Sequence, residues 1–595
     1  MLTRVQVGPS PRALLLRRDA LKLLAAGAST LLPGCIHPQR PPPDSGSAGD
    51  PLPAIIDAHC HVFNAADLPV GGFVRRVVLH DAEDQVILGE NRVEAQAALP
   101  WLAGVLVEIL SSQTKSARQE LEEITRGAVA GPLGVGEDPV ATVGRALARV
   151  LGAPGGVSPA LRGQGGTPPD PDGRDILLRE MRKEAGAGVF PQAAEGDFDA
   201  LAAGLLSGQG TIGRHLGWAE FLTRDRRTIT ARLIELYGRN RRVALFTPAL
   251  IDFSLWLDDE GGPRSPLEDQ IRVMERIQRL QTGPALHCMV PYDPWRQVHD
   301  VETGTRGPKA LDLVRMAVEE MGFVGIKLYP PMGFRPLGNA AVRQAYPERA
   351  QGIRNFPAKL DRALDDLYQY ASDRGVPIMA HATNSNGAAP GYAERAHPDN
   401  WLPVLRKYPK LRLNLAHFGD FQGATGTDAS TTWEHAVGRL VKRYPANAYS
   451  DLSYFSELLP GLASPEHRTA LLEFTGAFVR EFDPGGEHLL YGSDWIMLGR
   501  EANAERYLDV VSAAIRTVCS DDSCLDRFMW GNASRYLGLR PGEPNRMRLD
   551  HYYDKHRLDA SWLRSLDTMS GVPAGSRVVS GTSGSPATSR AQSRP

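Results

Sequence analysis

The sequence predicts an α/β fold, a (β/α)8 TIM barrel with a large, mainly helical insertion between its first and second strands. Short apolar runs recur along the 595 residues, stretches of helical length separate them, and several runs end in a Lys, His or Asp. Near-continuous apolar runs are typical of parallel strands that are buried on both faces. In barrel enzymes, polar groups at the carboxyl ends of the strands form the active site.

The first run, residues 55–61, ends in two histidines that are separated by one residue. Because side chains at i and i+2 of a strand point to the same face, His59 and His61 should project side by side. Two imidazoles in this position can converge on one metal ion, each with a nitrogen ~2.0–2.1 Å from a zinc ion. The His-x-His pattern alone is weak, so its weight depends on the runs that follow.

Four later runs also end in a polar residue of ligand type, namely Lys327, His381, His417 and Asp494. Three further runs complete the series without an obvious ligand, at residues 242–246, 285–290 and 448–452. This gives eight strands. Helices are expected between them, for example at residues 270–280, 311–321 and 360–372, so the β-then-α order of a barrel is complete.

Taken together, these motifs resemble the amidohydrolase superfamily, and most closely its amidohydrolase-2 branch. Asp57-Ala58-His59-Cys60-His61 resembles the metal motif of the first strand, and residues 322–330 resemble the fourth strand. His381 and His417 fall at the positions of the fifth- and sixth-strand histidines. Residues 491–495 resemble the eighth-strand aspartate motif, and residues 528–539 the closing Gly-Asn-Ala helix. The likeness covers most of residues 54–541.

The resemblance implies a metal-dependent hydrolase that cleaves an amide, ester or lactone bond with metal-activated water. It implies a divalent ion, with Zn²⁺ as the first choice and one ion favoured over two, held by His59, His61, His381 and Asp494. Asp494 would also act as the general base, and His417 would polarise the scissile carbonyl or bind a second metal ion. Lys327 and Arg335 are candidates for binding the substrate.

Each assignment has a plainer alternative. His59 and His61 could be polar residues in a turn, His381 a core histidine, and Asp494 the N-cap of the next helix. Lys327 could be carboxylated and bridge two metal ions, contact an anionic substrate, or have a structural role only. Arg335 could hold a carboxylate or be a solvated loop residue.

Two other functions stay open at this point. The same branch contains non-oxidative decarboxylases, which are lyases with the same metal ligands. A cell-surface binding protein on a barrel scaffold is the alternative outside enzymes, although such a protein has no need of this set of ligands, and the fold alone does not decide the matter.

The segment between the first two strands, residues 65–239, is far longer than a βα loop of ~2–6 residues. Helical patterns at residues 95–111, 116–128 and 198–206 predict a subdomain, with a Gly/Pro-rich break at residues 152–173. Because it leaves from the carboxyl end of the first strand, we expect it to cap the active site and to set substrate specificity.

The N-terminus has the pattern of an export signal. In residues 1–35, Arg17-Arg18 precedes an apolar run at 23–32 that is too short to span a bilayer, which takes ~20 residues. The run ends at Cys35 in a pattern that resembles a lipobox. A Pro-rich tether follows at residues 36–53. This predicts a twin-arginine-type lipoprotein that is anchored by lipid in the cell envelope; a cytoplasmic enzyme with a basic N-terminus is the alternative.

The remaining features concern the C-terminus, the cysteines and the charge. Residues 542–595 form a C-terminal extension, expected to be disordered from about residue 571. Cys519 and Cys524 could form a disulfide outside the cytoplasm or remain free thiols, and Cys60 should point away from the metal. A net charge of −2 argues against nucleic-acid binding, so the expected partner is a small-molecule substrate. Membrane contact is expected only through the lipid anchor, and the oligomeric state is open, a dimer included.

Overall fold

The strands of the protein are all parallel and follow one another in chain order. The computed structural model describes residues 54–79, 92–127, 138–152, 170–186, 197–208, 210–238, 243–257, 262–420, 429–519 and 521–569. Its strands are β1 (Ile55–Cys60), β2 (Val243–Pro248), β3 (Ala285–Leu286), β4 (Met289–Pro291), β5 (Gly325–Leu328), β6 (Ile378–His381), β7 (Leu413–Ala416), β8 (Ala448–Asp451) and β9 (Leu489–Leu490). They correspond to the eight predicted strands, because β3 and β4 together form the third one.

Hydrogen bonding divides these strands into two sheets, β1-β2-β3 and β4 to β9. The division falls within the third predicted strand, where the backbone N–H of Cys288 donates to the side chain of Gln278 (2.7 Å) instead of to a neighbouring strand. A single bridge between Ala249 and Met289 connects the two sheets. The described strands therefore form a barrel-type arrangement that is not closed by a continuous ladder.

The first and last strands are connected by individual backbone hydrogen bonds. Ala58 N donates to Tyr491 O (3.0 Å), and Asp494 N donates to His59 O (2.8 Å). These bonds place the segment after β9 directly against the carboxyl end of β1. Two of the predicted ligand segments, one from each end of the barrel sequence, are thus adjacent.

Alternate residues of the strands pack on different sides. One side, with Ile56, Leu245 and Met379 among its members, packs against the last helices of the chain in a smaller buried apolar cluster. The other side, with Ile326 and Ile378 among its members, packs against the surrounding helices in the main core. Burial on both sides explains why the strands are continuously apolar in sequence.

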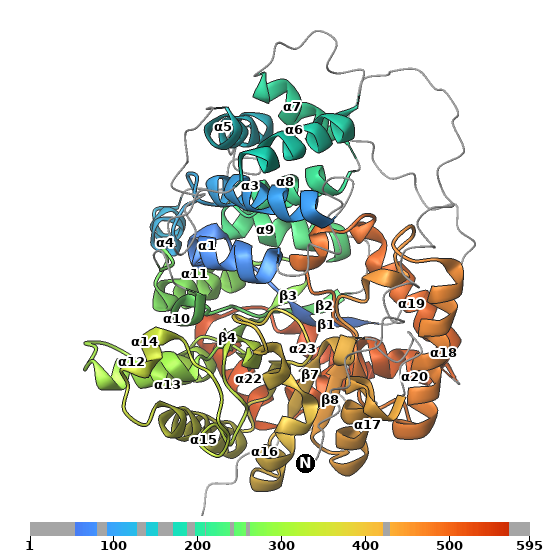
Figure 1. The fold of residues 1–595 in the computed structure, drawn as a ribbon. Coiled ribbons are helices and arrows are strands. Elements are labelled where there is room, and N and C mark those ends of the chain that lie inside the picture. Colours follow the sequence, from blue (N-terminus) through green and yellow to red (C-terminus); the bar gives the residue numbers. More distant parts are fainter. Residues whose placement is uncertain are drawn as a thin grey trace, which may run out of the picture. The chain divides into compact units, whose positions relative to one another are not determined.

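Helices separate the strands along the chain, except between β3 and β4, and lie around them (Figure 1). Those of the barrel are α10 (Ser254–Leu257), α11 (Leu267–Leu280), α12 (Pro294–Glu302), α13 (Ala310–Glu320), α14 (Glu348–Gln351), α15 (Phe356–Arg374), α16 (Leu402–Lys407), α17 (Trp433–Arg443), α18 (Pro465–Phe482), α19 (Tyr507–Val518), α20 (Asp522–Asp526) and α21 (Asn532–Leu537). The TIM-barrel prediction is confirmed.

The described part of the segment between β1 and β2 is mainly helical, which confirms the predicted insertion. Its helices are α1 (Val70–Phe73), α3 (Arg92–Leu110), α4 (Ala117–Thr125), α5 (Pro139–Leu151), α6 (Pro171–Ala185), α7 (Phe198–Ser207), α8 (Thr211–Phe221) and α9 (Arg226–Leu233). Helices α3 and α5 to α8 pack on one another and gather at the top of Figure 1. By composition α3 could cross a membrane, but 61% of its apolar window is buried in the protein. We therefore regard it as the core helix of the insertion.

Two further helices, α22 (Pro544–His556) and α23 (Ser561–Met569), complete the described part of the chain. His287 connects α22 to the sheet, because its Nε2 lies 2.8 Å from Tyr553 Oη and its Nδ1 lies 2.8 Å from Gly322 O. Cys519 and Cys524 form a disulfide between α19 and α20, while Cys60 and Cys288 are free and buried. The predicted signal, the tether, most of the Gly/Pro-rich break and the tail beyond residue 569 lie outside the described residues.

Candidate metal centre

The carboxyl ends of the strands bring three of the predicted ligands together. His61 Nε2 lies 3.3 Å from Asp494 Oδ1, and His59 Nε2 lies 3.7 Å from the same oxygen. One ligand atom from each of these three buried residues lies within 4.8 Å of the other two. Ligand atoms that are each ~2.0–2.1 Å from a tetrahedral zinc ion are ~3.3 Å apart, so the spacing suits a metal ion.

The surroundings of His61 set which of its nitrogens can bind a cation. Its Nδ1 lies 2.7 Å from the carbonyl oxygen of Ala249, an acceptor, so Nδ1 carries the proton and Nε2 has a free lone pair. Nε2 is buried and has no hydrogen-bond partner among the described residues. A buried nitrogen without a partner is costly, and a bound metal ion would satisfy it.

His59 is oriented in the same way, by a carboxylate. Its Nδ1 lies 3.1 Å from Asp451 Oδ2 and 2.8 Å from Ser453 Oγ, which leaves Nε2 as the unprotonated nitrogen. Lys327 Nζ lies 2.9 Å from this Nε2. Burial lowers the pKa of His59 to about 3, and Lys327 adds to the effect, so the ring is neutral and able to act as a ligand.

Asp451 is at the centre although the strand that it ends, residues 448–452, was predicted without a ligand, and Ser453 was not predicted either. The carboxylate is completely buried and accepts hydrogen bonds from the backbone of His417 (3.1 Å), from Asn414 Nδ2 (2.7 Å) and from Ser453 Oγ. Burial opposes its charge, but His59, His417 and these donors hold its pKa well below the usual range. The signal was present in the sequence, since Asp451 ends a strand as the other ligands do. Asp451 also forms a second possible metal group with His59 and His417.

His417 and His381 lie next to each other and beside the three-ligand group. The ring centroid of His417 is 4.8 Å from that of His59 and 4.7 Å from that of His381. His417 Nδ1 lies 2.9 Å from Ser453 Oγ. His381 stacks on Tyr329, its Nε2 lies 3.2 Å from Ser385 Oγ, and its buried Nδ1 has no partner among the described residues. Both histidines are therefore at the centre, although His381 is not within ligand spacing of His59, His61 and Asp494.

The backbone at two of these residues is left-handed, at φ 53° for Asp494 and φ 72° for His417. Such angles are uncommon for residues other than glycine and concentrate at functional sites. Burial would raise the pKa of Asp494, but the contact with His61 and the influence of the other neighbouring histidines lower it to about 2. The carboxylate is thus ionised at neutral pH.

The two predicted substrate-binding residues differ in position. Lys327 is fully buried at the centre, with Nζ also 3.2 Å from Met379 Sδ, and burial lowers its pKa to about 8. Arg335 follows β5 on a loop, where its backbone N–H donates to Asn339 Oδ1 (2.9 Å). Among the described residues, no hydrogen bond or ion pair connects the Arg335 side chain with the metal centre.

The sequence of the barrel matches a known family. Residues 303–539, from just after α12 to just beyond α21, match the family model described as Amidohydrolase. Over these residues the chain is similar to the amidohydrolase family. The match includes His381, His417 and Asp494, whereas His59 and His61 precede it. No curated protein matches the chain.

Several solved structures of amidohydrolase barrels are similar to this one. An amidohydrolase from Burkholderia multivorans with bound zinc is 12% identical, with a TM-score of 0.34 over 54% of this chain and 91% of that one. A putative 2-pyrone-4,6-dicarboxylic acid hydrolase from Pseudomonas putida is 15% identical (TM-score 0.30, 52% and 86%). The 4-oxalomesaconate hydratase LigJ from Rhodopseudomonas palustris is 14% identical (TM-score 0.33, 63% and 93%). At these scores, none of them determines the reaction of this chain.

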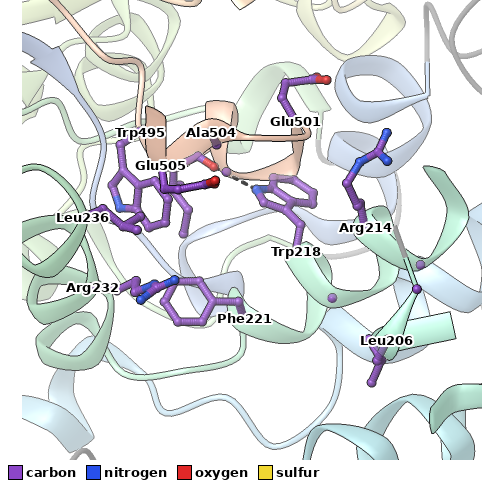
Figure 2. Close-up of a pocket in the computed structure, with 15 residues that line it drawn as sticks. Leu206, Arg214, Trp218, Phe221, Arg232, Leu236, Trp495, Glu501, Ala504 and Glu505 are labelled. Atoms are coloured by element: carbon purple, nitrogen blue, oxygen red, sulfur yellow. Dashed lines mark hydrogen bonds between the residues drawn. The ribbon is translucent and has the colours of Figure 1, made fainter. Parts of the chain in front are cut away.

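A cavity of about 300 Å³ lies between the insertion and the segment after β9 (Figure 2). Trp218 of α8 lies in its wall and donates from Nε1 to Ile496 O (2.9 Å). Trp495, the neighbour of Asp494, lines the cavity as well, but the metal-centre residues do not. The insertion thus forms one wall of this cavity.

Replacing His61 with alanine is expected to remove the metal from the barrel and to abolish activity without unfolding the protein. The reason is that His61 would contribute a ligand nitrogen, while the one hydrogen bond of its ring, to Ala249 O, is a small part of the fold's stability. Elemental analysis of the purified variant, together with circular dichroism, measures both effects. A variant that keeps the full complement of metal would show that His61 is not a ligand.

Replacing Asp451 with asparagine is expected to weaken metal binding or activity by ~10–100-fold. An amide cannot hold the Nδ1–H of His59 as strongly as a carboxylate, so the orientation of the His59 ligand nitrogen is less well fixed. Competition with a metal chelator measures the affinity. An unchanged affinity together with unchanged kcat/KM would mean that Asp451 does not position His59.

Proposed function

We propose that the protein is a metal-dependent hydrolase of amide, ester or lactone bonds. One observation carries the proposal: His59, His61 and Asp494 present their ligand atoms to one point, and the free nitrogen of His61 has no other partner among the described residues. His59, His61 and Asp494 would hold the ion, and His381, beside them, would complete the set. We propose Zn²⁺, one ion per chain, because imidazole and carboxylate ligands suit it.

When bound, the ion would supply hydroxide at neutral pH by lowering the pKa of water. The chain's own residues perform the proton transfers. Asp494, buried and ionised, accepts the proton of the attacking water and passes it to the leaving group. Its left-handed backbone, with the N–H bonded to His59 O, holds the carboxylate in place against β1.

The hydrogen bonds of His417 refine its role. Ser453 donates its hydroxyl proton to Asp451, because a carboxylate can only accept. His417 must then donate from Nδ1 to Ser453 Oγ, which leaves its Nε2 as an acceptor in the neutral ring. We propose that His417 stabilises the developing oxyanion after its Nε2 has taken up a proton, a form that burial disfavours in the resting protein, and that Lys327, whose Nζ lies 2.9 Å from His59 Nε2, contributes a second positive charge.

The proposal is tested on protein that is purified without a chelator. The metal content is measured by elemental analysis, and hydrolysis is assayed on a panel of lactones, amides and esters, with aromatic and dienyl carboxylates included. We expect about one zinc per chain and hydrolysis that disappears on chelation. Release of carbon dioxide from an acid of the panel, without hydrolysis of the others, would contradict the hydrolase proposal in favour of a lyase. Metal-free protein that hydrolyses none of them would contradict both.

A separate proposal concerns the location of the protein. We propose that it is exported through the twin-arginine route and anchored at Cys35. The Cys519–Cys524 disulfide supports an oxidising compartment. Replacing Arg17 and Arg18 with lysine should retain the precursor in the cytoplasm, and Cys35→Ser should release the enzyme from membranes. Fractionation that finds the unchanged protein unprocessed in the cytosol would contradict this.

A further inference from the structure

The two walls of the cavity in Figure 2 are joined to each other by buried hydrogen bonds. Trp218 Nε1, in the insertion, donates to Ile496 O (2.9 Å). Tyr237 Oη, at the end of the insertion, donates to Ala504 O (2.7 Å). Only 4% of Trp218 and 1% of Tyr237 are exposed. The space of about 300 Å³ is thus built into the fold, and its volume is at the lower end of the range for small-molecule sites.

Glycine residues make room for this cavity. Gly213 and Gly217 lie one turn apart on α8, and both line it. A Cβ atom at Gly217 would meet only Leu206 Cδ2, at 3.4 Å, so this position of the wall has room for a larger side chain. Gly499 lies on the other wall, where a Cβ atom would come within 2.9 Å of the Trp495 ring. The space therefore depends on the absence of side chains at these positions.

Aromatic rings form a further part of the wall. Trp218 and Phe221 come from α8 of the insertion, and Trp495 comes from the segment after β9. The rings of Phe221 and Trp495 pack at 64°, with their centroids 6.2 Å apart. Such a wall favours a ligand with a flat apolar body, and the faces of indole and phenyl rings also attract organic cations.

The wall contains two arginines, and both are bonded within the protein. Arg232 pairs with Glu235 (2.8 Å). Arg214 donates from Nε to Arg500 O and from Nη2 to Thr211 Oγ1, each at 3.3 Å. An anionic ligand would therefore have to compete with these partners for the guanidinium groups.

The two glutamates of the wall differ from each other. Glu501 Oε1 accepts a hydrogen bond from Tyr454 Oη (2.6 Å). Glu505 is exposed, and its side chain has no hydrogen bond or ion pair with another described residue. In the view of Figure 2 its carboxylate lies between the Trp495 and Trp218 side chains. The charge that remains available to a ligand in this cavity is therefore negative.

We propose that this cavity binds a small organic ammonium ion with an aromatic body. The body would lie among the three aromatic side chains of the wall, and the ammonium group would pair with Glu505. The site is separate from the metal centre, because no residue of the centre lines it. The inference is thus independent of the proposed hydrolysis.

Trp495 connects the two sites through its backbone. It directly follows Asp494 in the chain, and its carbonyl oxygen accepts a hydrogen bond from His61 N. A ligand in the cavity would therefore contact the ring of a residue whose backbone is bonded to two proposed metal ligands.

The test is a binding titration, followed by ligand-observed NMR, on the metal-loaded full-length protein at neutral pH. The probes are the cation benzylamine, the neutral benzyl alcohol and the anion benzoate, which have similar size. We expect benzylamine to bind ~3–10-fold more tightly than benzyl alcohol, because the rings and Glu505 both favour a cation. Benzoate should bind most weakly. Removal of the metal with a chelator should leave the affinity for benzylamine unchanged, because the metal-centre residues do not line the cavity.

Two substitutions separate the contribution of the space from that of the charge. Gly217→Leu should fill the cavity and weaken the binding of benzylamine and benzyl alcohol alike, by ~10-fold or more. Glu505→Gln should weaken benzylamine alone, by ~2–5-fold, because an exposed ion pair is a small contribution. Leucine is a better helix former than glycine, so α8 should tolerate it. Circular dichroism establishes that each variant is folded.

Each substitution has a matched control outside the cavity. Gly352→Leu adds the same side chain after α14, where a Cβ atom would meet nothing within 4 Å. Glu268→Gln removes the same charge from α11, where Glu268 pairs with Arg272. Both controls should bind all three probes as the unchanged protein does.

Several results would overturn the inference. Absence of benzylamine binding, undiminished affinity in folded Gly217→Leu, or binding that is lost with the metal would refute the site. Tightest binding of benzoate, or unchanged benzylamine affinity in Glu505→Gln, would refute the ligand class. If Gly217→Leu does not fold, Gly217→Ala and Glu505→Gln give the decision, since both should still weaken benzylamine binding. None of these measurements involves turnover, so failure of the hydrolase proposal would leave their outcome unaffected.

Discussion

Replacing Asp494 with asparagine is expected to lower kcat by roughly 10²–10⁴-fold while the metal content falls much less. Asparagine keeps the size of the side chain and one oxygen atom as a ligand, but it cannot accept a proton. The native carboxylate is buried, ionised and 3.3 Å from the ligand nitrogen of His61, so it is in position for both tasks. Steady-state kinetics and elemental analysis of the same preparation separate the two contributions.

The control for this prediction is Asp365→Asn. Asp365 is a partly exposed carboxylate of α15 that pairs with Lys407. It is not a residue of the metal centre, so its loss should leave kcat unchanged. Near-normal turnover by Asp494→Asn would remove Asp494 from the mechanism. A complete loss of metal in that variant would mean that its role as a ligand outweighs its role as a base.

Replacing Arg226 with methionine is expected to lower the free energy of unfolding by ~3–5 kcal/mol, the usual cost of leaving buried charges unpaired. Arg226 is fully buried and donates to Asp67 from Nε (3.1 Å) and to Glu120 from the backbone (2.9 Å), with its guanidinium nitrogens bonded to both carboxylates. The variant would leave two carboxylates facing each other in the protein interior. Denaturant titration measures the loss.

The charge of Glu120 gives this prediction a pH dependence. Burial raises its pKa to about 7, against the lowering influence of Arg226. Without the arginine, Glu120 should be protonated over a wider pH range, so the destabilisation should be smaller in acid and larger above pH 7. The control is Arg272→Met, which removes an exposed pair with Glu268 and should cost less than ~1 kcal/mol. Equal stability of the two variants would show that the buried group is dispensable.

Arg226 also connects the insertion with the metal centre. Asp67 and Glu120 both bond to Asn64, which directly follows the ligand strand on the loop after His61. Helices α4 and α9 of the insertion are thus held to this loop by charge as well as by packing. Loss of Arg226 should disturb the centre as well as the insertion.

The positions of the strands and most residues of the metal centre could be predicted from the sequence. Strands that are buried on both faces have to be apolar, so His59, His61 and Asp494 stand out as polar residues at the ends of apolar runs. Asp451 follows the same rule, but the run at residues 448–452 was predicted as a strand without a ligand. The break between β3 and β4 depends on a side chain, Gln278, that lies in another element and has no local signal.

Other features depend on contacts between segments that are distant in the sequence. Nothing near Arg226 indicates that Asp67 and Glu120 will surround it, since these residues come from separate parts of the insertion. The cavity of Figure 2 is equally hidden, because Trp218 lies in the insertion and Trp495 follows the last strand. The sequence shows which strand ends carry polar groups; the partners of these groups follow only from the three-dimensional packing.

The place of the insertion has a consequence for how the chain folds. β1 emerges first from the ribosome, but its partners are β2, beyond the whole insertion, and the segment after β9, near the end of the barrel. Contacts this distant in sequence carry a large loop-closure entropy and form late. We expect the insertion helices, whose contacts are local, to fold first and to shorten the effective distance between β1 and β2. His59 and His61 would then be the last ligands to reach their final positions. A metal ion could therefore bind to the complete site, and stabilise the barrel, only after synthesis is almost complete.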